Sequence, residues 1–144
     1  MAVRVRVKLK PLEEESWIET SALINSGYEA DKPEVVIPLA LARSLNLSLS
    51  GATLEERATP IGSGELRYLG EALELKVSCE ERETKAYRVH VLVSEYEHEV
   101  LISDYLAGEL GIAVEDLREG LWRFRDEPLS KLRRPAKPAY WLTA

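Results

Sequence analysis

The sequence predicts a mostly β domain whose strands close into a barrel-like sheet with one or two short helices. Apolar residues recur at every second position in several short runs, which is the period of a strand with one buried face. Only two segments have the wider apolar spacing of a helix. No repeat of roughly 20–50 residues is visible, which excludes a solenoid or a propeller. A closed sheet is the architecture that buries one face of so many short strands.

Length and composition predict one domain with a buried core. The chain has 144 residues, close to the roughly 150 expected per domain, and 45% of them are hydrophobic. No apolar run approaches the roughly 18–20 residues of a membrane span, and the N-terminus alternates charge with valine, unlike a signal peptide. The single cysteine, Cys79, excludes an internal disulfide. We therefore expect a cytoplasmic protein with no membrane partner.

The charge balance argues against a nucleic-acid binder. Nineteen Lys and Arg residues stand against 25 Asp and Glu residues, so the net charge is −6. Two basic clusters, at residues 4–10 and 131–134, flank acidic stretches, and we interpret them as solvated faces. Glutamine is absent and asparagine occurs only at positions 25 and 46, a low amide content that resembles the composition of thermophile proteins.

The first half of the chain alternates strand signals with one helix signal. Trp17 opens a segment rich in Ile and Thr that ends at a loop signal, Asn25-Ser26-Gly27. Pro38 follows a buried apolar run and occupies the first helical position, where its fixed φ suits a helix start. The predicted elements are strands over 3–9, 17–24 and 35–37 and a helix over 39–47.

The middle of the chain predicts a hairpin with a glycine-rich tip. Residues 53–59 and 65–69 are extended, and Pro, Gly and Ser punctuate the segment between them. Gly70 breaks the pattern before two more strands, over 72–77 and 85–93.

The C-terminal part predicts a buried strand, a capped helix and a tail. Residues 100–102 form the strand, Ser103 caps the helix that follows, and Gly111 ends it. Residues 112–124 are ambiguous between helix and strand. From Asp126 onwards, prolines and basic residues predict an extended tail. We therefore expect a single domain over 1–125 and a tail over 126–144.

The order of these elements resembles a known family. The apolar strand Ala22-Leu23-Ile24 enters the loop Asn25-Ser26-Gly27, and an apolar strand, a proline and a helix follow over 35–47. The glycine hairpin and a second apolar strand with its helix complete the set, which spans residues 17–112. This order resembles the retropepsin-like (retroviral-type) aspartic proteases, in which an apolar strand enters Asp-Thr/Ser-Gly.

The resemblance implies a subunit of a two-fold homodimer, with a groove for an extended polypeptide between the subunits. The catalytic loop would be Asn25, Ser26 and Gly27, with the Ser26 hydroxyl bonding across the dimer axis. The mobile flap over the groove would contain Ile61, Gly62, Ser63 and Gly64. The resemblance implies no cofactor and no metal, and Cys79, His90 and His98 lack the four closely spaced ligands of a closed zinc site.

Two departures from the family pattern matter. Asn25 stands at the position of the catalytic aspartate, and Ile102 or Ser103 takes the place of a glycine in the second apolar motif. In the family, one aspartate from each subunit forms a pair that shares a proton and activates a water. An asparagine amide is neutral and essentially non-basic, so we expect this chain not to cleave peptides.

Several interpretations of Asn25 stay open at this point. The chain is a natural pseudo-protease that binds polypeptide, or an active aspartic endopeptidase whose aspartate has been substituted by Asn25. Deamidation before Ser26 would slowly restore a carboxylate. Without the downstream elements, Asn-Ser-Gly is an ordinary turn, and a regulatory or structural dimer without a groove function is the remaining class.

Other polar and aromatic residues have simpler readings. His90 is expected on a strand, Asp31 in a loop, and Asp104 in the first turn of a helix, where the helix dipole favours a carboxylate. Three aromatic residues near the C-terminus are candidates for packing across the dimer: Trp122, Tyr140 and Trp141.

Overall fold

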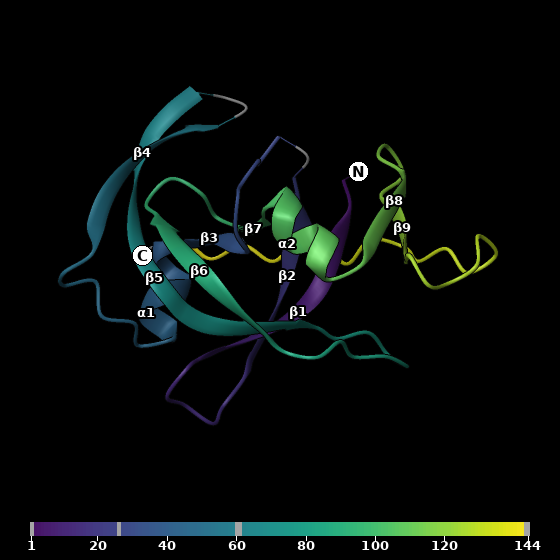
Figure 1. Ribbon diagram of the computed structural model, residues 1–144, viewed down its shortest axis with the longest axis horizontal. Helices are drawn as coiled ribbons and strands as arrows, with labels where there is room; N and C mark the ends of the chain where they lie inside the picture. The colour runs from purple at the N-terminus through teal and green to yellow at the C-terminus, as the bar shows by residue number, and fades with distance from the viewer. Residues whose placement is uncertain (1, 26, 60–61, 143–144) are drawn as a thin grey trace.

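The computed structural model describes residues 2–25, 27–59 and 62–142, and only the backbone of residues 58, 59, 62 and 63 (Figure 1). The helices are α1 (Leu39–Ser44) and α2 (Asp104–Glu109). The strands are β1 (Arg4–Pro11), β2 (Ile18–Ile24), β3 (Glu34–Pro38), β4 (Thr53–Thr59), β5 (Gly62–Val77), β6 (Tyr87–Ser94), β7 (Val100–Ile102), β8 (Ile112–Asp116) and β9 (Leu121–Phe124).

Six strands close into a barrel. The main sheet has the order β1-β2-β7-β3-β6-β5-β4, and β1 also pairs with β5, so β4 alone lies outside the ring. Strands β8 and β9 form a separate two-stranded sheet. The prediction of a mostly β, closed sheet with two short helices is therefore confirmed. Neither helix in the described part of the chain is long and apolar enough to span a membrane.

The barrel interior holds the main core, as the period-two pattern predicts. Val5, Val7 and Leu9 of β1 are almost fully buried, while the charged residues between them point outward. Opposite strands contribute the same kind of side chain, for example Leu73 and Leu75 of β5. The buried apolar surface of these side chains is the main source of the domain's stability.

Two predicted boundaries differ from the structure. Strand β5 runs without a break through Gly70, because Gly70 adopts φ +74° at a shift in the register with β6 and so bends the strand without ending it. The separate strands predicted on either side of Gly70 were wrong. Pro38 is the last residue of β3 and caps α1 with extended ψ, and α1 ends at Ser44, three residues before the predicted end.

The ambiguous segment after Gly111 is a hairpin of β8 and β9. Val114 pairs with Trp122, and Gly120 before β9 adopts φ +74°. Trp122 and Phe124 are buried, and their rings meet edge to face with centroids 5.1 Å apart. Trp122 thus belongs to the chain's own core, and the suggestion that it packs across a dimer is wrong.

The extended tail folds back onto the barrel. Arg133 forms a β-bridge with Trp122, and the Ala136 N–H donates to the Arg4 carbonyl at 2.8 Å. Further along, Trp141 packs against the main core, and its Nε1–H donates to Thr20 Oγ1 at 3.0 Å. Tyr140 beside it is 61% exposed. In Figure 1 the tail crosses behind the barrel, away from the β8–β9 hairpin.

An ion-pair cluster anchors the start of the tail. The buried Glu127 carboxylate accepts from Arg133 at 2.6 Å and from Arg82 at 3.2 Å. Arg133 also makes two hydrogen bonds to Glu81, and its guanidinium lies over the Phe124 ring. Because Arg133 is itself largely covered, these bonds are shielded from solvent.

Replacing Trp141 by alanine tests whether the tail is part of the folded domain. Trp141→Ala removes a hydrogen bond and a half-buried aromatic ring, and we expect a loss of about 2 kcal/mol in the free energy of unfolding. Urea titration measures this loss. The exposed neighbour provides the matched control, since Tyr140→Ala should change stability by less than about 0.5 kcal/mol. Equal effects of the two substitutions would contradict a docked tail.

Acid should weaken the ion-pair cluster. The hydrogen bonds from Arg133 lower the pKa of Glu127 to about 2. A carboxylate with a lowered folded-state pKa stabilises the protein above its unfolded-state pKa of roughly 4.3, and this stabilisation is lost as the pH falls towards the folded-state value. Glu127→Gln should therefore lower the melting temperature at pH 7 and flatten its decline between pH 5 and pH 2. Glu119→Gln, at an exposed position, should leave the profile unchanged.

Candidate functional site

The Asn25 loop and Ser103 emerge side by side at one end of the barrel. Strand β2 pairs in parallel with β7, with Ile24 opposite Ile102. Because the two strands point the same way, the residues that follow them lie at the same edge of the sheet. The two apolar motifs that the sequence separates by almost 80 residues are thus neighbours.

The side chain of Asn25 stabilises the turn in its own loop. Its Oδ1 accepts from the Gly27 N–H at 2.9 Å, and its carbonyl accepts from the Tyr28 N–H at 3.1 Å. Asn25 is half-buried and Gly27 is exposed, while Ser26 lies outside the described residues. The side chain at position 25 therefore supplies an acceptor oxygen to a tight turn at the protein surface.

Ser103 clamps β3 to the start of α2. Its hydroxyl accepts from the N–H groups of Leu106 and Glu34 and donates to the Glu34 carbonyl at 2.8 Å. This confirms the predicted N-cap of α2, and the same hydroxyl also hydrogen-bonds the backbone of β3. A glycine here would lack both functions.

Asp104 ties the Asn25 loop to α2. Its N–H donates to the Tyr28 carbonyl at 2.8 Å, and its Oδ1 accepts from the Ala30 N–H at 3.0 Å. This confirms Asp104 in the first helical turn, as predicted, and Asp31 in the loop. The bond from Ala30 gives the Asp104 carboxylate a structural partner.

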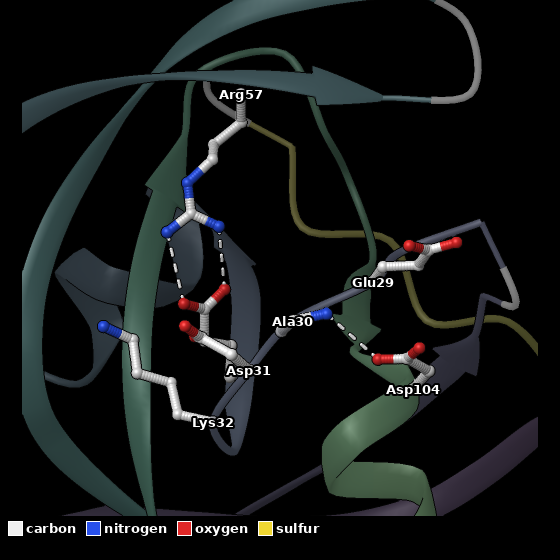
Figure 2. A pocket seen from close by; sticks show the side chains of 7 residues that line it. Glu29, Ala30, Asp31, Lys32, Arg57 and Asp104 are labelled. Carbon is white, nitrogen blue, oxygen red and sulfur yellow. Dashed lines mark hydrogen bonds and ion pairs between the residues drawn. The ribbon is translucent and has the colours of Figure 1, made fainter.

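A polar cleft of about 540 Å³ opens beside the loop (Figure 2). In Figure 2, Arg57 reaches down from β4, and Asp104 lies across from it on α2. The lining residues are Glu29, Ala30, Asp31, Lys32, Glu34, Arg57 and Asp104.

A buried carboxylate joins the cleft walls. Glu34 is 1% exposed, and Arg57 donates to both of its oxygens, at 2.9 and 3.2 Å. The Tyr28 hydroxyl donates to the same carboxylate at 2.9 Å. Burial and the Glu34 charge raise the pKa of the Tyr28 phenol, and the hydrogen bonds to Glu34 raise the pKa of Arg57. Tyr28 therefore stays protonated and Arg57 charged, so this network is permanent at ordinary pH.

The predicted flap is the β4–β5 hairpin. Its pairing runs to Thr59 opposite Gly62 and Ala58 opposite Ser63, and Gly64 lies opposite Arg57. Ile61 and the side chain of Ser63 lie outside the described residues. Figure 1 shows the hairpin extending beyond the barrel at the end where the β2–β3 loop also projects.

The base of this hairpin packs against apolar side chains. Leu66 of β5 belongs to a second buried cluster, which lies on the outer face of the barrel and is separate from the main core. Its other buried members are Val36, Leu92 and Leu101, and Leu23, Tyr28 and Tyr68 border it. The hairpin is therefore held by apolar contacts and by the Arg57–Glu34 ion pair.

Sequence reasoning missed the network centred on Glu34. The signal available was a glutamate directly before the fully buried run Val35-Val36-Ile37, where a charge needs a partner. Nothing in the sequence pairs it with Arg57, 23 residues later, because that contact depends on the hairpin's path. The described residues contain no cluster of three or more His, Cys, Asp or Glu side chains able to hold a metal.

The chain matches no known protein family and no curated protein in sequence.

Glu34→Gln should loosen the hairpin. The variant replaces the charged acceptor of Arg57 at a buried site, and we expect a loss of about 3 kcal/mol in the free energy of unfolding. Amide hydrogen exchange should rise selectively in β4 and the first half of β5. Glu55→Gln is the matched control, because it removes the other carboxylate bound to Arg57. The Glu55 carboxylate is exposed enough that it should contribute roughly 1 kcal/mol or less to the free energy of unfolding. A uniform rise in amide hydrogen exchange across all strands would contradict a local effect of the Glu34–Arg57 ion pair on the hairpin.

Proposed function

We propose that this protein is a retropepsin-like homodimer that binds an extended polypeptide in a groove between its subunits and does not hydrolyse it. One observation carries the proposal. The parallel strands β2 and β7 bring the Asn25 loop and Ser103 to the same edge of the sheet, and the Arg57–Glu34 ion pair holds the β4–β5 hairpin on neighbouring β3. This arrangement supports the resemblance that the order of the sequence motifs suggested.

The cleft supports binding of an extended chain. It lies between the Asn25 loop and the β4 strand of the hairpin, and it is lined by polar side chains and loop backbone. An extended peptide gains affinity chiefly through main-chain hydrogen bonds. The polar side chains and loop backbone of the cleft can make such bonds with peptides of many sequences. A second subunit related by a two-fold axis would continue the groove across the two Asn25 loops.

Asn25 is the reason to expect no hydrolysis. The family mechanism needs one carboxylate as base and one carboxylic acid as proton donor. An amide performs neither step, and losing a positioned base alone costs roughly 10²–10⁴ in rate. In a homodimer both positions are lost together.

An active aspartic endopeptidase whose catalytic aspartate has been substituted by Asn25 in this chain is the alternative, and the loop geometry is compatible with it. The oxygen of Asn25 that accepts from the Gly27 N–H is one that an aspartate carboxylate supplies equally well. The turn therefore accommodates either residue without rearrangement.

Asn25→Asp tests the proposal. The native chain should be dimeric and should bind extended peptides without cleaving them, whereas the aspartate variant should cleave them at acidic pH. A transition-state mimic with a hydroxyl at the scissile position should block that cleavage. Asn46→Asp is the matched control, since Asn46 is the chain's other asparagine and is exposed.

Three measurements separate the outcomes. Sedimentation at micromolar concentration should show a dimer, and a monomer would overturn the shared groove. Cleavage of peptides by the native chain would show that Asn25 does not abolish hydrolysis. If neither chain cleaves or binds peptide, the groove function fails altogether.

A further inference from the structure

A second cluster of polar side chains begins at Lys32 in the wall of the cleft and continues onto β5 and β6. The Tyr68 hydroxyl is 2.8 Å from His90 Nδ1, and His90 Nε2 is 3.6 Å from Glu71 Oε1. Lys32 Nζ donates to the same hydroxyl at 3.4 Å. Four side chains thus form one continuous line, Lys32–Tyr68–His90–Glu71.

The strand register brings these residues together. Val89 and Val91 point into the barrel, so His90 between them faces outward. On β5, Glu71 lies directly opposite His90, and the register shift at Gly70 brings Tyr68 to the same face. The Tyr68 and His90 rings are parallel, with centroids 6.1 Å apart. The line is therefore held by the sheet itself.

The donors and acceptors fit one order of protons. Lys32 has only donors, so the Tyr68 oxygen accepts from it and its own hydrogen is free to be donated to His90 Nδ1. His90 then carries its hydrogen on Nε2, facing Glu71. The Tyr68 hydroxyl raises the pKa of Lys32, which keeps the ammonium charged beside that oxygen.

We propose that Tyr68 is an activated nucleophile that accepts acyl groups, with His90 as its base and Glu71 as the positioning residue for the imidazole. The order is that of a nucleophilic hydroxyl, a histidine and a carboxylate, with a hydrogen bond between Tyr68 and His90 and a longer contact of 3.6 Å between His90 and Glu71. Lys32 stabilises the negative charge that develops on the attacking oxygen. The proposed step uses neither Asn25 nor a second subunit.

The step balances with an activated acyl donor such as N-acetylimidazole. The Tyr68 Oη–carbonyl carbon bond forms as the hydroxyl proton passes to His90 Nδ1. The bond between the carbonyl carbon and the imidazole nitrogen of the donor breaks, and the departing imidazolide takes that proton. The products are O-acetyl-Tyr68 and imidazole.

Tyr68 lines a cavity of about 250 Å³ together with the segment that precedes β4. The other lining residues are Leu47, Ser48, Ser50, Gly51, Ala52, Leu69 and Ala72. This volume accommodates a small acyl group.

The other tyrosines provide internal standards. Tyr28 donates to the Glu34 carboxylate, which Arg57 also binds, and Tyr87 donates to the Glu109 carbonyl, so neither hydroxyl is paired with an imidazole. Tyr96 and Tyr140 are 74% and 61% exposed and report the reactivity of an unassisted phenol. Half-buried Tyr68 should react more slowly than these two unless His90 activates it.

The test is site-resolved acetylation of the full chain by N-acetylimidazole at pH 7.5, followed by peptide mass mapping. We expect Tyr68 to be acetylated at least about 10-fold faster than Tyr96, a conservative share of the roughly 10²–10⁴ that a positioned base contributes. A Tyr68 rate equal to or below that of Tyr96 would overturn the proposal, with no variant required.

Variants assign the roles. His90→Gln should bring Tyr68 acetylation to or below the Tyr96 rate while Tyr96 and Tyr140 are unchanged. Glu71→Gln should lower only the Tyr68 rate, and Glu71→Asp should restore part of it, which a purely structural role would not produce. Glu65→Gln, at an exposed site on the same strand, should have no effect. Unchanged Tyr68 acetylation in His90→Gln would contradict a base at this position.

Discussion

The buried carboxylate of Glu34 is the contact on which the site end of the barrel depends. Burying a charge is costly unless it is paired and hydrogen-bonded, and here Arg57 and Tyr28 supply three bonds. Arg57 comes from the hairpin and Tyr28 from the segment just after the Asn25 loop. The backbone of Glu34 is at the same time bound by Ser103. One residue at the start of β3 therefore connects the hairpin, the loop and the capped helix.

This connection fixes the geometry of the loop without relying on one residue type at position 25. The Asn25 turn needs only an acceptor oxygen at that position, and the rest of the loop is held by hydrogen bonds of Asp104 and Tyr28. Ser103 adds a cap for α2 and hydrogen bonds to the backbone of Glu34 in β3. The local architecture therefore has room for either an amide or a carboxylate at position 25.

Charge in this molecule is concentrated in networks at the two ends of the fold. The Glu127 cluster holds the tail against β9, whereas the Glu34 cluster holds the hairpin against β3. In both, an arginine binds two carboxylates, one of them buried, so the ion pair is partly shielded and geometrically defined. The Lys32–Tyr68–His90–Glu71 line differs, because its central pair is a hydroxyl and an imidazole and not an arginine with two carboxylates.

The sequence by itself determined the strands, the capped helix after Ser103 and the position of the Asn25 loop, because periodicity and capping report local geometry and the burial of one face. It could not decide the continuity of β5 through Gly70, the hairpin in residues 112–124 or the docking of the tail. It also could not bring Glu34 to Arg57 or Tyr68 to His90. Those pairings depend on strand register and on closure of the barrel, and register is settled only when side chains distant in sequence pack together.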